Sequence, residues 1–174
     1  MLSFQTDKEL LEFADLCRHD TFNLKNRMIL SLNCLSRLLD PRLDYLPYFN
    51  VFMTDPPEAC HDWPDYGDMT GRYLEAHLMI EEMTGVKTIE QEKLKALLLS
   101  FFSGNDGLSY RHPKPWHEKS ALMFDQSRVL FALNRWYGKT RDKKLLSVIN
   151  KFLKGLLSVA TKKGNFYSWG GCGF

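Results

Sequence analysis

Six stretches of the sequence carry apolar residues at helical spacing, and the lengths of the connections between them alternate. The connections after the first, third and fifth stretches are a few residues each, whereas those after the second and fourth are long. Short connections between helices produce antiparallel hairpins. The sequence therefore predicts an all-α fold, with one helical-hairpin domain over residues 1–174 that contains three consecutive antiparallel α-hairpins.

The bounds of the expected helices follow from apolar periodicity and from residues that start or stop a helix. Thr88 and Gln91 have the spacing of a capping box. Pro41 ends the second stretch, and Gly85 is typical of a helix C-cap. No stretch alternates with period two over more than a few residues, so we expect strands only as short pieces within the loops. The expected helices cover residues 6–18, 22–39, 69–83, 88–102, 125–137 and 141–162.

Charge and cysteine content limit the classes of partner and cofactor. The chain has 23 basic and 21 acidic residues, which leave a net charge of +2. This charge is too small to attract nucleic acid or an anionic membrane strongly, so we expect neither as a partner. The four cysteines show no C-x-x-C spacing, and we expect no disulfide scaffold, no metal and no cofactor. Residues 1–9 lack the basic and apolar segments of an export signal, and the compartment is left open.

The two longest non-helical stretches, residues 40–67 and 103–124, contain most of the unusual side chains. Long ordered loops in compact domains usually carry function. The alternation of connections places both loops beside the N-termini of the third and fifth helices. Aromatic rings among carboxylates and histidines favour a sugar ligand, although the same rings could instead pin the loops to the helices. The expected ligand-binding residues are His61, Trp63, Tyr66, Arg72, Tyr110, Trp116, His117 and Trp169.

Asp65 and Asp68 are the candidate catalytic residues, because glycoside hydrolysis requires a pair of carboxyl groups. One carboxyl group protonates the leaving oxygen, and the other activates water or attacks the sugar directly. Asp68 also has a structural alternative as the N-cap of the third helix. It can further form an ion-pair network with Arg72 and Glu75, which follow it at helical spacing.

A weak internal repeat relates the third helix to the fifth. Arg72-Tyr-Leu-Glu-Ala opens the third helix as Arg128-Val-Leu-Phe-Ala opens the fifth, and Gly85-Val-Lys-Thr matches Gly138-Lys-Thr. A recurring unit of about fifty residues built from two helices is typical of stacked-hairpin arrays. Such arrays are either open solenoids or closed toroids.

The segment His-Asp-Trp-Pro-Asp-Tyr-Gly-Asp-Met-Thr-Gly-Arg-Tyr-Leu-Glu-Ala, residues 61–76, resembles a passage common in the six-hairpin, (α/α)6-toroid glycosidases. In that superfamily a loop bearing tryptophan and aspartate leads into an inner helix. The resemblance implies a carbohydrate-active domain, and we expect a glycoside hydrolase acting on oligosaccharides. Further matching segments lie at residues 83–85, 106–110 and 127–142, so the likeness covers about residues 60–165.

The number of hairpins differs from that of the superfamily. A toroid of this kind closes with six hairpins, whereas this sequence predicts three, a partial (α/α)6 toroid-like array. We therefore expect the open edge to be covered by a second copy of the chain or by the remainder of a longer protein. The alternative function is a non-catalytic helical-hairpin domain that binds a glycan or a protein partner.

Overall fold

The structure is a computed structural model that describes residues 23–62 and 66–170. Its helices are α2 (Leu24–Arg37), α3 (Gly67–Thr84), α4 (Ile89–Ser100), α5 (Met123–Thr140) and α6 (Lys143–Ser158), with a short 3-10 helix η1 (Pro41–Leu43). Its strands are β1 (Leu39–Asp40), β2 (Leu46–Pro47), β3 (Asn50–Phe52), β4 (Glu58–Cys60), β5 (Thr161–Lys163) and β6 (Phe166–Ser168). The expected helix over residues 6–18 lies outside the described residues.

The prediction of an all-α fold is wrong, because the fold is mostly helical but also contains three small antiparallel sheets. The pairs are β1 with β2, β3 with β4, and β5 with β6, each a two-stranded sheet. Pairing gives partners to backbone N–H and C=O groups that a long loop would otherwise leave to water. The third pair also shortens the expected sixth helix. Gly164, expected to end that helix, instead lies in the turn between β5 and β6 with φ 62°.

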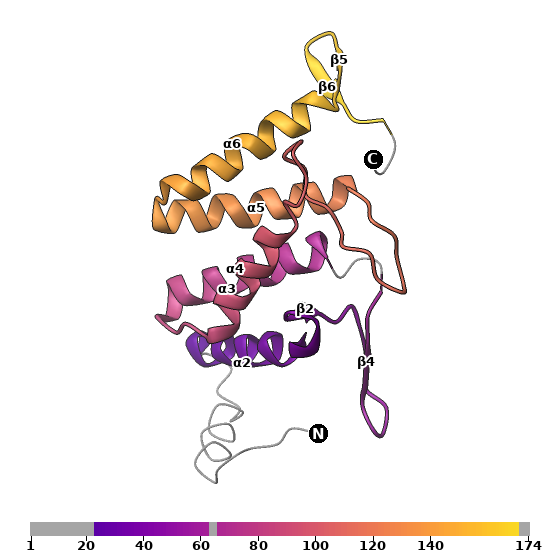
Figure 1. Ribbon diagram of the computed structural model, residues 1–174. Coiled ribbons are helices and arrows are strands. Elements are labelled where there is room, and N and C mark those ends of the chain that lie inside the picture. Colours follow the sequence, from indigo (N-terminus) through magenta and orange to yellow (C-terminus); the bar gives the residue numbers. More distant parts are fainter. Residues whose placement is uncertain (1–22, 63–65, 171–174) are drawn as a thin grey trace.

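The helices are stacked around α3, which packs against α2, α4 and α5, while α5 also packs against α6 (Figure 1). The core is rich in leucine and contains side chains from α3, α4, α5 and α6 together with residues of the connecting segments, such as Leu46 and Leu108. Among the described helices, none is both long enough and apolar enough to cross a bilayer.

Two glycines let α3 and α5 approach each other closely. Gly67 and Gly71 are four residues apart and therefore lie on one side of α3. A Cβ atom at Gly67 would overlap the side chain of Asp125, and one at Gly71 would lie 2.8 Å from the backbone carbonyl of Arg128. This contact holds the N-terminal ends of α3 and α5 side by side, together with the loops that precede them.

Candidate functional site

The two long loops meet in a layer of stacked rings. The His61 ring is sandwiched between Tyr48 and Trp116, with centroid distances of 4.4 Å and 5.1 Å and interplanar angles of 25° and 9°. Its Nε2 atom lies 3.4 Å from Oδ2 of Asp40. Because the stacked rings and the buried carboxylate surround His61, this predicted ligand-binding residue joins the two loops instead of facing solvent.

Asp40 anchors one side of this layer. Its carboxylate accepts hydrogen bonds from the backbone N–H of Arg42 at 2.9 Å and from the guanidinium of the same residue at 3.0 Å and 3.1 Å. The hydrogen bonds from Arg42 hold the pKa of Asp40 well below its usual range, although burial acts in the opposite direction. A carboxylate held in this way fixes the turn at η1 and orients His61.

Tyr66, which directly precedes α3, forms a second group of rings with Trp116 and His117 of the loop that precedes α5. The rings of Tyr66 and His117 meet edge to face at 4.8 Å, and those of Trp116 and His117 at 6.2 Å. Burial lowers the pKa of the His117 ring and so favours its neutral form. Tyr66 is buried, and its ring also contacts Phe101. These three predicted ligand-binding residues therefore lie together, and their rings join the loop before α5 to the start of α3 and the end of α4.

The N-terminal ends of α3 and α5 carry a network of carboxylates and arginines. Asp68 is not the N-cap of α3, since the helix begins at Gly67 and Asp68 lies in its first turn. Its Oδ1 atom is 3.0 Å from Nε of Arg72 and 3.4 Å from Nε of Arg128. Arg72 is half exposed, and Asp68 is partly exposed. Asp68 and both arginines can therefore contact a ligand at the surface.

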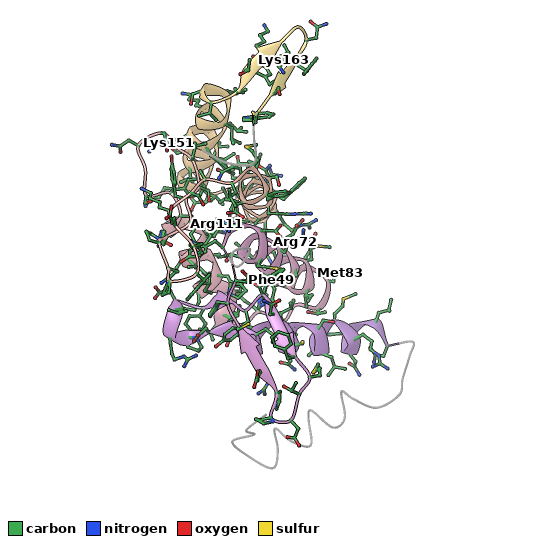
Figure 2. The ribbon with its side chains drawn as sticks, turned by 90° about the vertical axis from the view of Figure 1, so that its right-hand side faces the viewer. Phe49, Arg72, Met83, Arg111, Lys151 and Lys163 are labelled. Carbon is green, nitrogen blue, oxygen red and sulfur yellow. The ribbon has the colours of Figure 1, made fainter. Side chains whose placement is uncertain are left out.

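Asp125, in the first turn of α5, takes over the capping role that the sequence assigned to Asp68. Its Oδ1 atom accepts a hydrogen bond from the backbone N–H of Asp68 at 3.0 Å. Its two oxygens also pair with Nε and Nη2 of Arg111, whose side chain is only 1 % exposed. Burial raises the pKa of Asp125, and the Arg111 guanidinium opposes that rise. Figure 2 labels Arg111 near the middle of the molecule.

The remaining predicted site residues lie elsewhere. The hydroxyl of Tyr110 donates a hydrogen bond of 2.6 Å to Asp106, which raises the pKa of Tyr110 to about 12. Trp169 donates from Nε1 to the carbonyl of Leu156 at 2.9 Å, which ties it to the last turn of α6. Among the described residues, neither Tyr110 nor Trp169 stacks with the rings of Tyr48, His61 and Trp116. Trp63 and Asp65 lie outside the described residues.

A groove between α3 and α5 was not predicted from the sequence. It has a volume of about 450 Å³, and its lining combines one exposed aromatic ring with charged and amide side chains. Phe131 is 58 % exposed at this surface. The lining residues are Glu75, Glu82, Phe131, Asn134, Arg135, Gly138 and Lys139.

Ion pairs between the two helices border the groove. Arg135 lies 3.6 Å from Glu75 and 3.4 Å from Glu82, and Lys139 lies 2.6 Å from Glu81. A signal for this arrangement exists in the sequence. Acidic residues recur at positions 68, 75 and 82, and arginines at 128 and 135. A spacing of seven residues puts each set on one side of its helix, so the two sets can face each other.

Within residues 23–62 and 66–170, no cluster of His, Cys, Asp and Glu is arranged to hold a metal ion. No family model matches the sequence, and neither a curated protein nor a solved structure matches it.

Proposed function

We propose that the protein binds an oligosaccharide along the groove between α3 and α5. The observation that supports this proposal is the exposed ring of Phe131 beside Asn134 and the Glu75–Arg135 ion pair. The C–H face of a sugar packs on an aromatic ring, and its hydroxyl groups need donors and acceptors at the edges of that contact. Carboxylate oxygens accept hydrogen bonds, guanidinium groups donate them, and an amide does both.

The network around Asp68 lengthens this surface toward the N-terminal ends of the helices. Asp68, Arg72 and Glu75 lie on one side of α3, because they are four and three residues apart. Arg128 and Arg135 lie on the facing side of α5 and pair with Asp68 and Glu75. A polar stripe of several turns with one aromatic ring suits a chain of sugars better than a single sugar.

Replacing Phe131 by alanine is the test of oligosaccharide binding. We expect Phe131→Ala to weaken binding at least about tenfold, because the sugar loses its apolar platform; this corresponds to about 1.4 kcal/mol. The measurement is isothermal titration calorimetry with cellohexaose, xylohexaose, maltohexaose and an oligogalacturonate. Phe166→Ala is the matched control, since Phe166 is 62 % exposed on β6. Equal losses in both variants, or no heat with any of the four oligosaccharides, would contradict the proposal.

Hydrolysis of the bound oligosaccharide is the second candidate function. It is favoured by the position of Asp68, a partly exposed carboxylate in the first turn of α3 at the end of the stripe. The helix dipole favours negative charge there. Arg72 and Arg128 engage this carboxylate as an acceptor. Asp68 therefore fits the role of base or nucleophile, and Asp65 would be the acid.

The release of reducing ends from the same oligosaccharides tests hydrolysis. We expect Asp68→Asn and Asp65→Asn each to lower the rate by about 10²–10⁴-fold, the usual contribution of general acid–base catalysis. Asp55→Asn, on the loop between β3 and β4, is the control and should leave the rate unchanged. If the unaltered protein binds an oligosaccharide without releasing reducing ends, hydrolysis is excluded while the binding proposal stands.

A further inference from the structure

The charged residues of the chain are segregated, although the net charge is only +2. Residues 43–62 contain four acidic residues and no lysine or arginine, and we call this segment the acidic end. Residues 143–170 contain six lysines and no acidic residue, and we call this segment the basic end. The acidic end includes the β3–β4 hairpin, and the basic end includes α6 and the β5–β6 hairpin.

The two hairpins lie at opposite ends of the molecule. Figure 1 shows the β3–β4 hairpin at the lower end and the β5–β6 hairpin at the upper end. Figure 2, turned about the vertical axis, keeps Lys163 at the top and the β3–β4 hairpin at the bottom. The acidic hairpin of one copy therefore cannot reach the basic hairpin of the same copy.

Both ends also expose large apolar side chains. Met53, beside β3, is 94 % exposed. Water-exposed apolar groups gathered on a protruding element are typical of an interaction surface. The exposed apolar residues are Phe49, Val51, Phe52 and Met53 at the acidic end, and Leu153, Leu157, Phe166 and Tyr167 at the basic end.

The backbone and the charges of both hairpins are open to a partner. Each hairpin is an isolated two-stranded sheet, which is marginal by itself in water and has edges that can pair with another strand. Among the described residues, none of the six lysines of the basic end lies within 4.0 Å of a carboxylate. Likewise, neither Asp55 nor Glu58 of the acidic hairpin forms an ion pair with a basic side chain of the described residues. These charges are therefore not neutralised by ion pairs within the described part of the molecule.

We propose that the protein associates head to tail with further copies of itself, so that the acidic end of one copy lies against the basic end of the next. Opposite charges and exposed apolar side chains on both surfaces make the two ends complementary. A contact between two like ends would instead bring like charges together. A head-to-tail contact is heterologous, and it continues to a closed ring or an open chain of copies.

Sedimentation velocity of the unaltered protein at micromolar concentration gives the first test. We expect species larger than a dimer at about 50 mM NaCl and association at least about tenfold weaker at about 500 mM, because salt screens exposed charges. A protein that stays monomeric up to about 100 μM at low salt would overturn the proposal. So would an association that stops at the dimer and does not respond to salt.

A charge swap gives the second test. Lys162→Glu with Lys163→Glu makes the basic hairpin acidic, and Asp55→Lys with Glu58→Lys makes the acidic hairpin basic. We expect each double variant alone to be monomeric and an equimolar mixture of the two to associate again, which also shows that both are folded. Lys25→Glu, an exposed site on α2, is the control and should associate like the unaltered protein. A mixture that stays monomeric, or double variants that associate normally by themselves, would overturn the proposal.

Discussion

Replacing Arg111 by methionine is expected to lower the free energy of unfolding by about 3–5 kcal/mol. The guanidinium is buried and pairs with both oxygens of Asp125, whose side chain is only 3 % exposed. Without Arg111, the carboxylate stays buried with the backbone N–H of Asp68 as the donor that the structure still shows. A buried charge without its partner is among the most destabilising changes in a protein. Urea denaturation followed by circular dichroism measures the loss.

Two further variants separate the loss of the ion pair from the loss of side-chain volume. Arg111→Met combined with Asp125→Leu removes both charges and should recover most of the stability, because apolar side chains can replace a buried pair. Arg72→Met breaks the exposed pair with Asp68 and should cost less than about 1 kcal/mol. If Arg111→Met costs no more than Arg72→Met, the buried pair does not hold α5 to the loop that contains Arg111.

Acidification is expected to destabilise the fold through His77. This side chain is fully buried in α3, and burial lowers its pKa from 6.5 to about 4. Between pH 6.5 and about pH 4, the unfolded chain therefore binds a proton at His77 that the folded protein does not bind. The free energy of unfolding should fall as the pH is lowered through that window, by about 3 kcal/mol at its lower limit. Above pH 6.5 both states are neutral at this residue, and its effect vanishes.

His77→Leu isolates this effect from the carboxyl groups that titrate in the same range. The His77 Nδ1 atom lies 3.3 Å from Oγ1 of Thr88, while Nε2 has no hydrogen-bond partner among the described residues. Leucine removes the titrating group and the unpaired nitrogen together. Chemical denaturation between pH 7 and pH 4 should show the variant gaining stability relative to the unaltered protein as the pH falls. A difference that stays constant with pH would refute this prediction.

The described helices could be predicted from local sequence because each buries an apolar stripe encoded within a few turns. The expected helix over residues 69–83 is observed as Gly67–Thr84, and the one over 88–102 as Ile89–Ser100. Gly85 caps α3 with φ 77°, as predicted, because a glycine adopts this conformation without strain. The end of α5 differs from the prediction. The helix continues past Gly138 to Thr140, and Arg141 adopts the left-handed conformation instead.

The capping box expected for α4 shows how tertiary contacts override a local pattern. Thr88 occupies the N-cap position, but its side chain makes no capping hydrogen bond. Its hydroxyl lies 3.3 Å from His77, and the Gln91 amide donates to Glu81 at 2.7 Å. Both partners belong to α3, so packing against that helix supplied alternatives to the local bonds.

The β5–β6 hairpin had a local signal that helical periodicity obscured. The apolar spacing of α6 continues as far as Val159, which extended the expected helix to residue 162. Gly164 and Asn165 form a two-residue loop of the kind that joins antiparallel strands. The helix actually ends at Ser158.

The sequence by itself determined the positions of α2 to α6, because hydrophobic periodicity acts over short distances along the chain. Only the tertiary structure decided what the polar residues do. Asp125 caps α3 and pairs with Arg111, and Arg135 meets Glu75 across the groove, although these partners are 57, 14 and 60 residues apart. Such contacts depend on how closely α3 and α5 pack at Gly67 and Gly71, a distance that periodicity does not specify. The tertiary structure likewise decided that His61 stacks between Tyr48 and Trp116 and that a groove lies between α3 and α5, because the residues of each come from segments far apart in the sequence.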